Sequence, residues 1–235
     1  MSADEQELLC WLALVRVEGL GSASAKKIAE HFASIEEAFA ASEKQLRAIA
    51  GLDQRGIQAL LAFSDWAGAE KELSRIRELG AAILPITAAA YPERLRQIPD
   101  PPPFLYLRGE IQARDQKAVA VVGSRSASPY GVKVARDLCR ALAALGFTVV
   151  SGMARGIDGE AHQATLAAGG RTVAVLGSGV DVVYPGEHRL LYHDIGGSGA
   201  VVSELPMGTR PLAHHFPARN RIISGLSLGV VVVEA

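Results

Sequence analysis

The chain has 235 residues, of which 49% are hydrophobic and 21% are charged, and its formal net charge is −1. This composition supplies enough apolar side chains for the core of one large domain or two smaller ones. No run of about eighteen apolar residues and no apolar leader with a cleavage site occurs, which argues against a membrane-spanning or secreted protein and predicts a cytosolic location. Cys10 and Cys139 lie far apart in apolar stretches, so we expect buried, reduced thiols.

Charge is distributed unevenly along the chain. Residues 1–115 hold 13 Lys and Arg against 17 Asp and Glu, whereas residues 116–235 hold 11 against 8, together with five of the six histidines. The second part is therefore the better candidate for binding an anion. A domain that bound nucleic acid through charge alone would be more basic than this.

Short segments with helical periodicity predict a small all-α domain over residues 1–80. We expect helices at residues 5–17, 24–31, 35–41, 43–50 and 54–64 and in a longer segment that ends at Leu79. The glycine turn and helix of residues 17–28 recur 32 residues later, in residues 49–60, as in paired helix-hairpin-helix units.

The glycines of such units bring backbone amides at a helix N-terminus close to a phosphate, a role that Lys26 and Lys27 would assist in the first copy. The second copy has Asp53 where a second glycine would stand, and its carboxylate repels phosphate. We therefore favour a packing or protein-interaction module of the SAM-like kind over direct DNA binding.

Residues 81–115 are predicted to connect this domain to the next. Four prolines within five positions, residues 99–103, exclude a helix there and favour an extended path along a domain surface. A stiff linker is the simplest interpretation.

From residue 116 to residue 235, apolar strand runs alternate with helices, which predicts an α/β fold with an extended Rossmann-like, doubly wound, mostly parallel sheet. The expected strands are residues 118–122, 147–150, 171–176, 200–203 and 230–233, and the expected helices are residues 130–145, 158–168, 188–195 and 219–227. Right-handed crossovers bring the loops after the strand carboxyl ends to one edge of the sheet, where we expect a ligand to bind.

The loop after the first of these strands begins with Gly123, Ser124 and Arg125. A glycine for close approach, hydroxyl groups and a guanidinium are typical of an anion cradle with a bidentate clamp. The loop lacks the GxGxxG fingerprint, and no acidic residue ends the next strand, so a dinucleotide cofactor is disfavoured.

The loop after the second strand, residues 151–158, opens a helix with small residues that expose backbone amides to a phosphate. Asp158, Glu160 and His162 stand close together on that helix, which raises the alternative of a metal or acid–base site. We favour helix capping by Asp158 and local hydrogen bonding, because a third convincing metal ligand is missing.

The loop after the third strand, residues 177–185, combines a flexible backbone with an aromatic ring. Tyr184 is placed either to stack on a base or to pack against Pro185 in a turn. The sequence leaves both interpretations open.

The segment of residues 214–227 is the richest in ligand-binding side chains. Phe216, Arg219, Asn220 and Arg221 place an aromatic ring, two guanidinium groups and an amide at the start of a helix. These groups suit stacking on a base and clamping of a nucleic-acid backbone. The alternative is that Phe216 belongs to the core and that the two arginines pair with carboxylates of the neighbouring domain.

Four segments in this order resemble the DNA-processing protein A (DprA/Smf) family: IPDPPPFLY at residues 98–106, VGSR at 122–125, SGMARGIDGEAH at 151–162 and FPARNRIISGLS at 216–227. The resemblance runs from about residue 91 to the end and includes the helical N-terminal unit. It implies an extended Rossmann fold, homodimers, single-stranded DNA bound in a positively lined pocket, and assistance in loading the RecA recombinase during natural transformation.

The resemblance implies that ten residues of this chain bind DNA. We expect no catalytic residue, no cofactor and no metal. The ten residues are Gly123, Ser124, Arg125, Ser151, Gly152, Arg155, Phe216, Arg219, Asn220 and Arg221. Arg125, Ser151 and Gly152 would hold phosphates, and the residues of the 216–221 group would hold or border bases and backbone. Arg155 is the weaker candidate, because it is free to point to solvent.

Family members continue beyond the strand with which this chain ends, so we expect a shortened form that lacks any dimer or recombinase contact made by residues beyond 235. An enzymatic alternative is a nucleotide-processing hydrolase of the lysine-decarboxylase-like (LOG) group, but the PGGxGTxxE signature of that group is absent. A further alternative is an interaction scaffold in which residues 1–80 carry all the binding.

Overall fold

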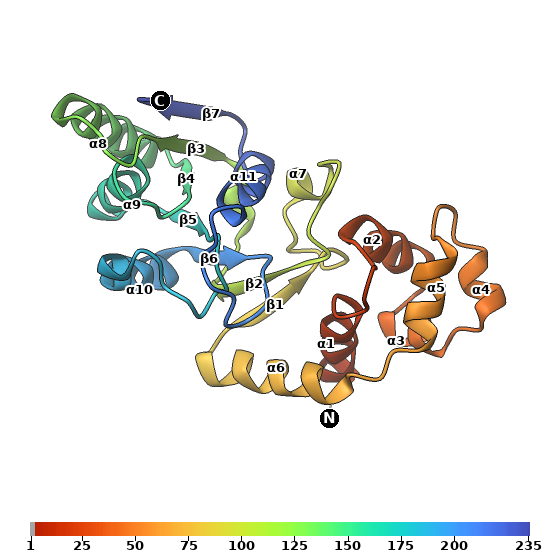
Figure 1. The fold of residues 1–235 in the computed structure, drawn as a ribbon. Helices are drawn as coiled ribbons and strands as arrows, with labels where there is room; N and C mark the ends of the chain where they lie inside the picture. The colour runs from red at the N-terminus through yellow and green to blue at the C-terminus, as the bar shows by residue number, and fades with distance from the viewer. Residues whose placement is uncertain (1–2) are drawn as a thin grey trace. The chain divides into compact units, whose positions relative to one another are not determined.

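The computed structural model describes residues 3–235 and divides the chain into two compact units. The first unit contains the residues up to Ala88 together with Pro99–Phe104, and the second contains Ala89–Ile98 and Leu105–Ala235. Figure 1 labels their helices and strands. The interval predicted to be a connecting segment therefore contributes to both units.

The first unit consists of short helices, and four of them start at a polar side-chain cap. Ser34, Ser42, Asp53 and Asp65 each precede a helix and accept a hydrogen bond from an amide of its first turn. The last helix ends at Gly80, whose φ of 65° lies in the left-handed region that favours glycine. The elements of this unit are α1 Ala3–Leu14, α2 Ser22–His31, α3 Ile35–Ala40, α4 Glu43–Arg47, α5 Gln54–Leu61, α6 Trp66–Leu79 and β1 Ala82–Pro85. The predicted all-α domain is confirmed, with helix ends up to three residues earlier than expected.

Strands and helices alternate through the second unit, as the sequence predicts. Its strands are β2 Phe104–Gly109, β3 Ala118–Gly123, β4 Thr148–Ser151, β5 Thr172–Val175, β6 Ala200–Ser203 and β7 Val230–Val233. Its helices are α7 Glu93–Arg96, α8 Pro129–Ala144, α9 Ile157–Ala167, α10 Arg189–Ser198 and α11 His215–Gly225, with short 3-10 turns η1 Ala113–Gln116 and η2 Gly186–His188.

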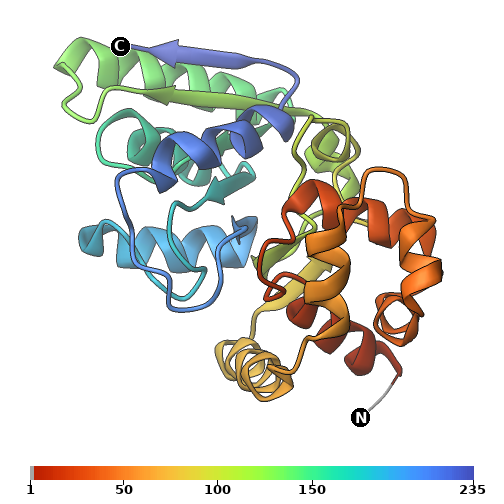
Figure 2. The ribbon, with the colours of Figure 1, turned by 45° about the vertical axis from the view of Figure 1, so that its right-hand side comes forward.

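The sheet has seven strands in the order β1-β2-β6-β5-β4-β3-β7. The five strands from β6 to β7 pair in parallel, and β2 pairs antiparallel with β6, so that Tyr106 stands opposite Ser203. Strand β7 lies alongside β3 at the sheet edge (Figure 2), with Gly123 opposite Val233. The prediction of a mostly parallel α/β sheet is confirmed, and the shared direction of these strands brings their following loops to one edge.

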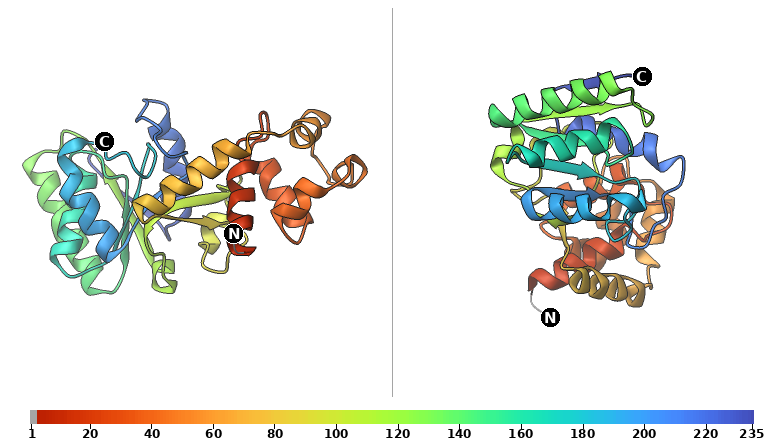
Figure 3. Two further views of the ribbon diagram at one scale, coloured as in Figure 1. Left: turned by 90° about the horizontal axis from the view of Figure 1, so that it is seen from below. Right: turned by 90° about the vertical axis from the view of Figure 1, so that its left-hand side faces the viewer.

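Both faces of the sheet carry helices: α8, α9 and α10 on one, α7 and α11 on the other (Figure 3). On the first face, Val121 of β3 and Val149 of β4 pack against Ala135, Cys139 and Ala161 of α8 and α9. Burial raises the pKa of the Cys139 thiol to about 11. Both cysteines are buried and free, as predicted.

Two features of the second unit differ from expectation. Strand β2 starts directly after Pro103 and joins the sheet, because a proline that precedes a strand removes no hydrogen bond from its ladder. Helix α11 starts at His215 rather than at Arg219, since Pro217 falls in the first turn, where a missing amide hydrogen costs nothing. Phe216 is therefore held by a helix rather than by a loop.

Candidate nucleic-acid interface

A cleft of about 660 Å³ opens at the carboxyl edge of the sheet, where the sequence predicts a ligand. Its walls come from the end of β3 and the loop after it, from the loop after β4, from α11 and from the end of β7. The predicted site residues that line it are Gly123, Ser124, Arg125, Phe216, Arg219 and Asn220. Residues from four separate regions of the sequence thus share one cavity.

Arg125 is the exposed cation of this cleft. Its guanidinium carbon lies 5.0 Å from the centre of the Phe216 ring, a cation–π distance. Among the described residues, no carboxylate or carbonyl oxygen accepts a hydrogen bond from Arg125. All the guanidinium donors therefore remain available to an incoming anion while the ring holds the group in place.

Arg219 behaves differently, because its side chain is buried and only 5% of the residue is exposed. Its Nη1 donates to the carbonyl oxygen of Gly152 at 2.7 Å and to that of Val175, and its Nε donates to Oδ1 of Asn220 at 3.1 Å. Burial lowers the pKa of Arg219. A side chain on Gly152 would collide with the guanidinium, so this glycine is required for the close approach. Arg219 thus ties α11 to the ends of β4 and β5.

Asp158 lies close to the same cleft in the first turn of α9 and is buried. Burial raises its pKa, and the positive charge of Arg219 and the backbone amide of Ala154 act in the opposite direction. The sequence-based prediction that Asp158 caps the helix is wrong, since Gly156 occupies the cap position with a φ of 69°. The carboxylate instead accepts a hydrogen bond from the Ala154 amide, within the loop that it follows.

Glu234 fills the anion cradle that the sequence predicts after β3. Its carboxylate accepts hydrogen bonds from the amide of Ser128, at 2.8 Å, and from the Ser128 hydroxyl, at the N-terminus of α8. Its backbone carbonyl accepts a hydrogen bond from the amide of Ser124 at 2.9 Å. The Ser128 donors lower the pKa of Glu234. Sequence reasoning missed this residue, although the parallel pairing of β7 with β3 places its carboxyl end beside that loop.

A smaller cavity of about 170 Å³ adjoins the cleft and shares Arg125 and Phe216 with it. Tyr184 lines this cavity, and its ring centre lies 5.8 Å from that of Phe216 in a tilted pair. Arg155 lines it as well and forms an exposed ion pair with Glu187, with Nη2 and Oε2 3.0 Å apart. The guanidinium of Arg125 and the ring of Phe216 therefore stand between two hollows.

Three predicted site residues lie outside both cavities. The Ser151 hydroxyl is buried and donates to the carbonyl oxygen of Val121 at 2.6 Å, so it has no hydrogen left for a phosphate. Gly152 lies beneath Arg219. Arg221 pairs with Glu204, with Nη1 and Oε1 2.8 Å apart. The alternative that this arginine forms an ion pair is therefore right, but the carboxylate belongs to its own unit rather than to the neighbouring domain.

Glu160 and His162 of α9 do not combine into a metal site. Glu160 pairs with Arg136 at 2.7 Å, and Nδ1 of His162 lies 2.7 Å from the Thr172 hydroxyl. Burial, with the charges of His188 and Arg219, lowers the pKa of His162 to about 3, so the ring is neutral at physiological pH. Across residues 3–235, no group of three or more His, Cys, Asp or Glu is placed to hold a metal ion.

The fold and the cleft together define a class: an α/β protein with a helical N-terminal unit that presents a guanidinium over an aromatic ring at the carboxyl edge of its sheet. Two family models match the chain, the DNA recombination-mediator protein A model over residues 82–235 and the SAM-like helix-hairpin-helix tandem model over residues 12–64. The chain belongs to the DNA recombination-mediator protein A (DprA/Smf) family.

Relatives support this assignment along most of the chain. Protein Smf of Synechocystis is 38% identical over 229 residues, and Protein Smf of Escherichia coli is 40% identical over 226 residues, each alignment covering 96% of this chain. The alignments cover 58% and 59% of those two proteins, so the chain spans less than two thirds of their length.

Solved structures agree with the fold. The structure of DNA processing protein A from Streptococcus pneumoniae matches with a TM-score of 0.78 and 34% identity, over 94% of this chain and 76% of that one. The structure of the Helicobacter pylori protein, described as giving insights into its unique single-stranded DNA binding mode, matches with a TM-score of 0.58 and 29% identity. That match covers 65% of this chain and 68% of that one.

Proposed function

We propose that this chain binds single-stranded DNA in the cleft at the carboxyl edge of its sheet. The observation that carries the proposal is Arg125, an exposed guanidinium without a polar partner among residues 3–235 that lies 5.0 Å from the Phe216 ring centre. The Helicobacter pylori relative, whose structure addresses single-stranded DNA binding, supports it.

The cleft offers groups that suit the phosphate and the base of a nucleotide. Arg125 binds a phosphate through charge-assisted hydrogen bonds. The half-buried ring of Phe216 offers a face on which an unpaired base stacks, and the exposed amide of Asn220 borders the same space. Buried Arg219 keeps α11 in position rather than contacting DNA. Since a base in a duplex is stacked and paired, single strands enter this site more easily.

Charge contributes modestly to the expected affinity. The second unit has one free guanidinium in its cleft and only a small excess of basic residues. We therefore expect the logarithm of the association constant to fall with the logarithm of the salt concentration, with a slope of about two to four ion equivalents. Stacking on aromatic rings supplies the remainder, at about 1–3 kcal/mol per base.

Protection of incoming DNA, assistance in loading RecA and homodimer formation by the full-length protein are further proposals that rest on family membership. In this role the chain binds DNA and catalyses no reaction. No helix in the described part of the chain is long and apolar enough to cross a membrane, and the cytosolic location stays a prediction.

The test is fluorescence anisotropy with a labelled oligo-thymidine and a matching duplex at two salt concentrations. Arg125→Ala is compared with Arg140→Ala, which removes an equal charge from the exposed surface of α8, outside the cleft. We expect Arg125→Ala to weaken single-strand binding at least about tenfold, equivalent to about 1.4 kcal/mol, and Arg140→Ala to change it less than about twofold. Equal effects of the two variants, or equal affinity for the duplex, would refute the proposed site.

The hydrolase alternative of the LOG group is tested in the same preparation. Incubation with nucleoside monophosphates is expected to release no free base, because the buried Asp158 and the capping Glu234 leave the cleft without a solvent-accessible acid–base pair. Release of base that disappears in Asp158→Asn would replace the binding proposal with an enzymatic one.

A further inference from the structure

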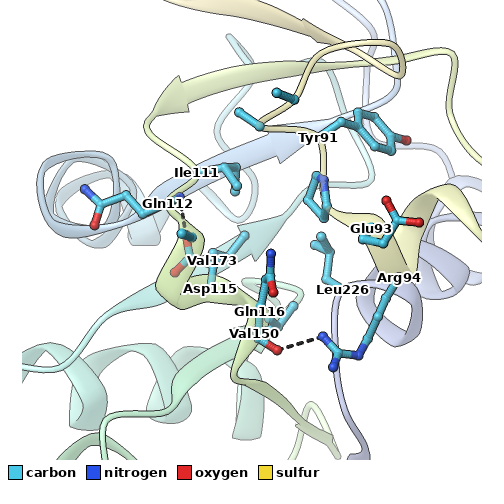
Figure 4. Close-up of a pocket in the computed structure, with 14 residues that line it drawn as sticks. Tyr91, Glu93, Arg94, Ile111, Gln112, Asp115, Gln116, Val150, Val173 and Leu226 are labelled. Carbon is cyan, nitrogen blue, oxygen red and sulfur yellow. Dashed lines mark hydrogen bonds between the residues drawn. The ribbon is translucent and has the colours of Figure 1, made fainter.

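A second cavity of the α/β unit, of about 540 Å³, shares no lining residue with the DNA cleft. It lies between the turn η1, the residues around α7 and the sheet (Figure 4). The face of the sheet that lines it is the one that does not carry α8 and α9. Its apolar lining comes from Val150 of β4, Val173 of β5, Leu226 at the end of α11, and Ile111. A cavity of this size and apolar character suits the body of a small organic molecule.

The acidic groups at this pocket are already neutralised. The Glu93 carboxylate pairs with Arg96, with Nη1 and Oε2 2.7 Å apart. The buried Asp115 carboxylate receives hydrogen bonds from Arg171, at 2.6 and 2.9 Å, and from the Thr148 hydroxyl at 2.8 Å. Neither carboxylate therefore favours a cationic ligand.

Arg94 is the cation that remains available at the rim. Its side chain reaches from α7 to η1, where Nη1 donates to the backbone carbonyl oxygen of Gln116 at 2.7 Å (Figure 4). Within the described residues, the Nε and Nη2 donors of Arg94 and the side-chain amide of Gln116 have no partner. The hydrogen bond through Nη1 orients the guanidinium and leaves two adjacent donors, the arrangement that a carboxylate accepts.

We propose that this pocket is a ligand site for a small carboxylic acid with an apolar body, whose carboxylate binds Arg94 and Gln116 while the body packs on Val150, Val173 and Leu226. The apolar lining selects for size and hydrophobicity, and the unsatisfied guanidinium selects for negative charge. The proposal is independent of DNA binding, because it uses other residues on another part of the sheet.

The test uses 4-phenylbutyrate and its neutral amide, which share one apolar body and differ in charge. Each is titrated into the ¹⁵N-labelled chain and followed by NMR chemical shifts. We expect saturable shifts of amides around Val150, Val173 and Leu226, and about tenfold tighter binding of the acid than of the amide, as for a charge-assisted hydrogen bond of about 1.4 kcal/mol.

Two variants and one control complete the test. Arg94→Gln is expected to abolish the preference for the acid while retaining binding of the amide, and Ala113→Trp, at the exposed rim, to block both ligands. Lys117→Gln removes a nearby charge that does not line the pocket and should leave both affinities unchanged. No saturable binding to the wild type, equal affinity for acid and amide, or shifts confined to the Arg125 cleft would each overturn the proposal.

Discussion

The two lysines of the first hairpin repeat in the helical unit and Arg125 in the α/β unit are used in different ways. In the helical unit, Lys27 donates through Nζ to the carbonyl oxygen of Gly51 at 3.1 Å, which joins the two hairpin repeats, and Lys26 pairs with Glu30. Asp53, which interrupts the second repeat, caps α5. In the cleft of the α/β unit, Arg125 contacts an aromatic ring and keeps its polar donors available.

This difference explains why the number of basic residues in a unit is a poor predictor of where an anion binds. A guanidinium that already donates to protein oxygens must lose those bonds before it binds a phosphate, so its net contribution to affinity is small. Arg219 and Arg221 are held in this way, and Arg155 is held more loosely, by an exposed carboxylate. We therefore expect binding of an anion to depend on the unsatisfied donors rather than on the number of basic residues.

The largest expected effect is on stability and separates structural arginines from binding arginines. Arg219→Ala leaves the carbonyl oxygens of Gly152 and Val175 without a donor and Asp158 without a nearby positive charge, so we expect the unfolding free energy to fall by about 2–4 kcal/mol. Urea denaturation measures the change. Arg125→Ala should stay within about 0.5 kcal/mol of the wild type, and an equal loss in both variants would erase the distinction.

The next effect concerns pH. The pKa of His162 is lowered to about 3 in the fold, while an unfolded histidine titrates at about 6.5, so between these values the unfolded chain binds the additional proton. The contribution of His162 to the unfolding free energy is therefore fully present above about pH 6.5. It decreases as the pH drops below that value, by up to about 1.4 kcal/mol per pH unit. Urea titrations of wild type and His162→Gln between pH 5 and pH 7 should diverge with that sign. Parallel curves would contradict the expectation.

A smaller effect tests whether Lys27 of the helical unit contributes to stability rather than to DNA binding. Lys27→Gln removes the hydrogen bond to Gly51, and we expect it to cost about 0.5–1 kcal/mol of stability while single-strand affinity changes less than about twofold. Lys44→Gln, on an exposed lysine of α4, is the matched control for loss of charge. A large loss of DNA binding in Lys27→Gln alone would mean that the hairpins bind DNA after all.

The smallest effect concerns Glu234. Glu234→Gln removes a negative charge from the edge of the cleft and keeps an oxygen that accepts from Ser128, so we expect single-strand affinity to rise about two- to threefold, or about 0.5 kcal/mol. Anisotropy at low salt measures this rise. The control, Asp137→Asn, removes a carboxylate of α8 that pairs with Lys133 outside the cleft. An equal rise in the single-strand affinity of this control variant would mean that the effect comes from the net charge of the protein.

The fold was largely predictable because its signals are local. Apolar runs of strand length alternating with helical periods indicate a parallel sheet, and serine and aspartate caps mark where helices start. Strand β2 was missed because its apolar residues follow four prolines, and its place beside β6 depends on a partner about a hundred residues away in sequence.

The location of the cleft was predictable, and its lining only in part. The loops after β3 and β4 and the start of α11 were correctly expected at one edge, and six of the ten predicted residues line the cleft. The burial of Ser151, the pairing of Arg221 with Glu204 and the occupation of the cradle by Glu234 were not predictable. Each depends on a partner distant in the chain.

By itself, the sequence determined the fold class, the helical repeat and the edge of the sheet at which the cleft opens, because periodicity, caps and strand direction are properties of short segments. Only the tertiary structure decided which charged groups are free. Arg125 keeps its donors, whereas Arg219 gives its own to carbonyl oxygens on neighbouring strands. Hydrogen-bond satisfaction depends on what folding brings close, and local sequence does not encode that directly.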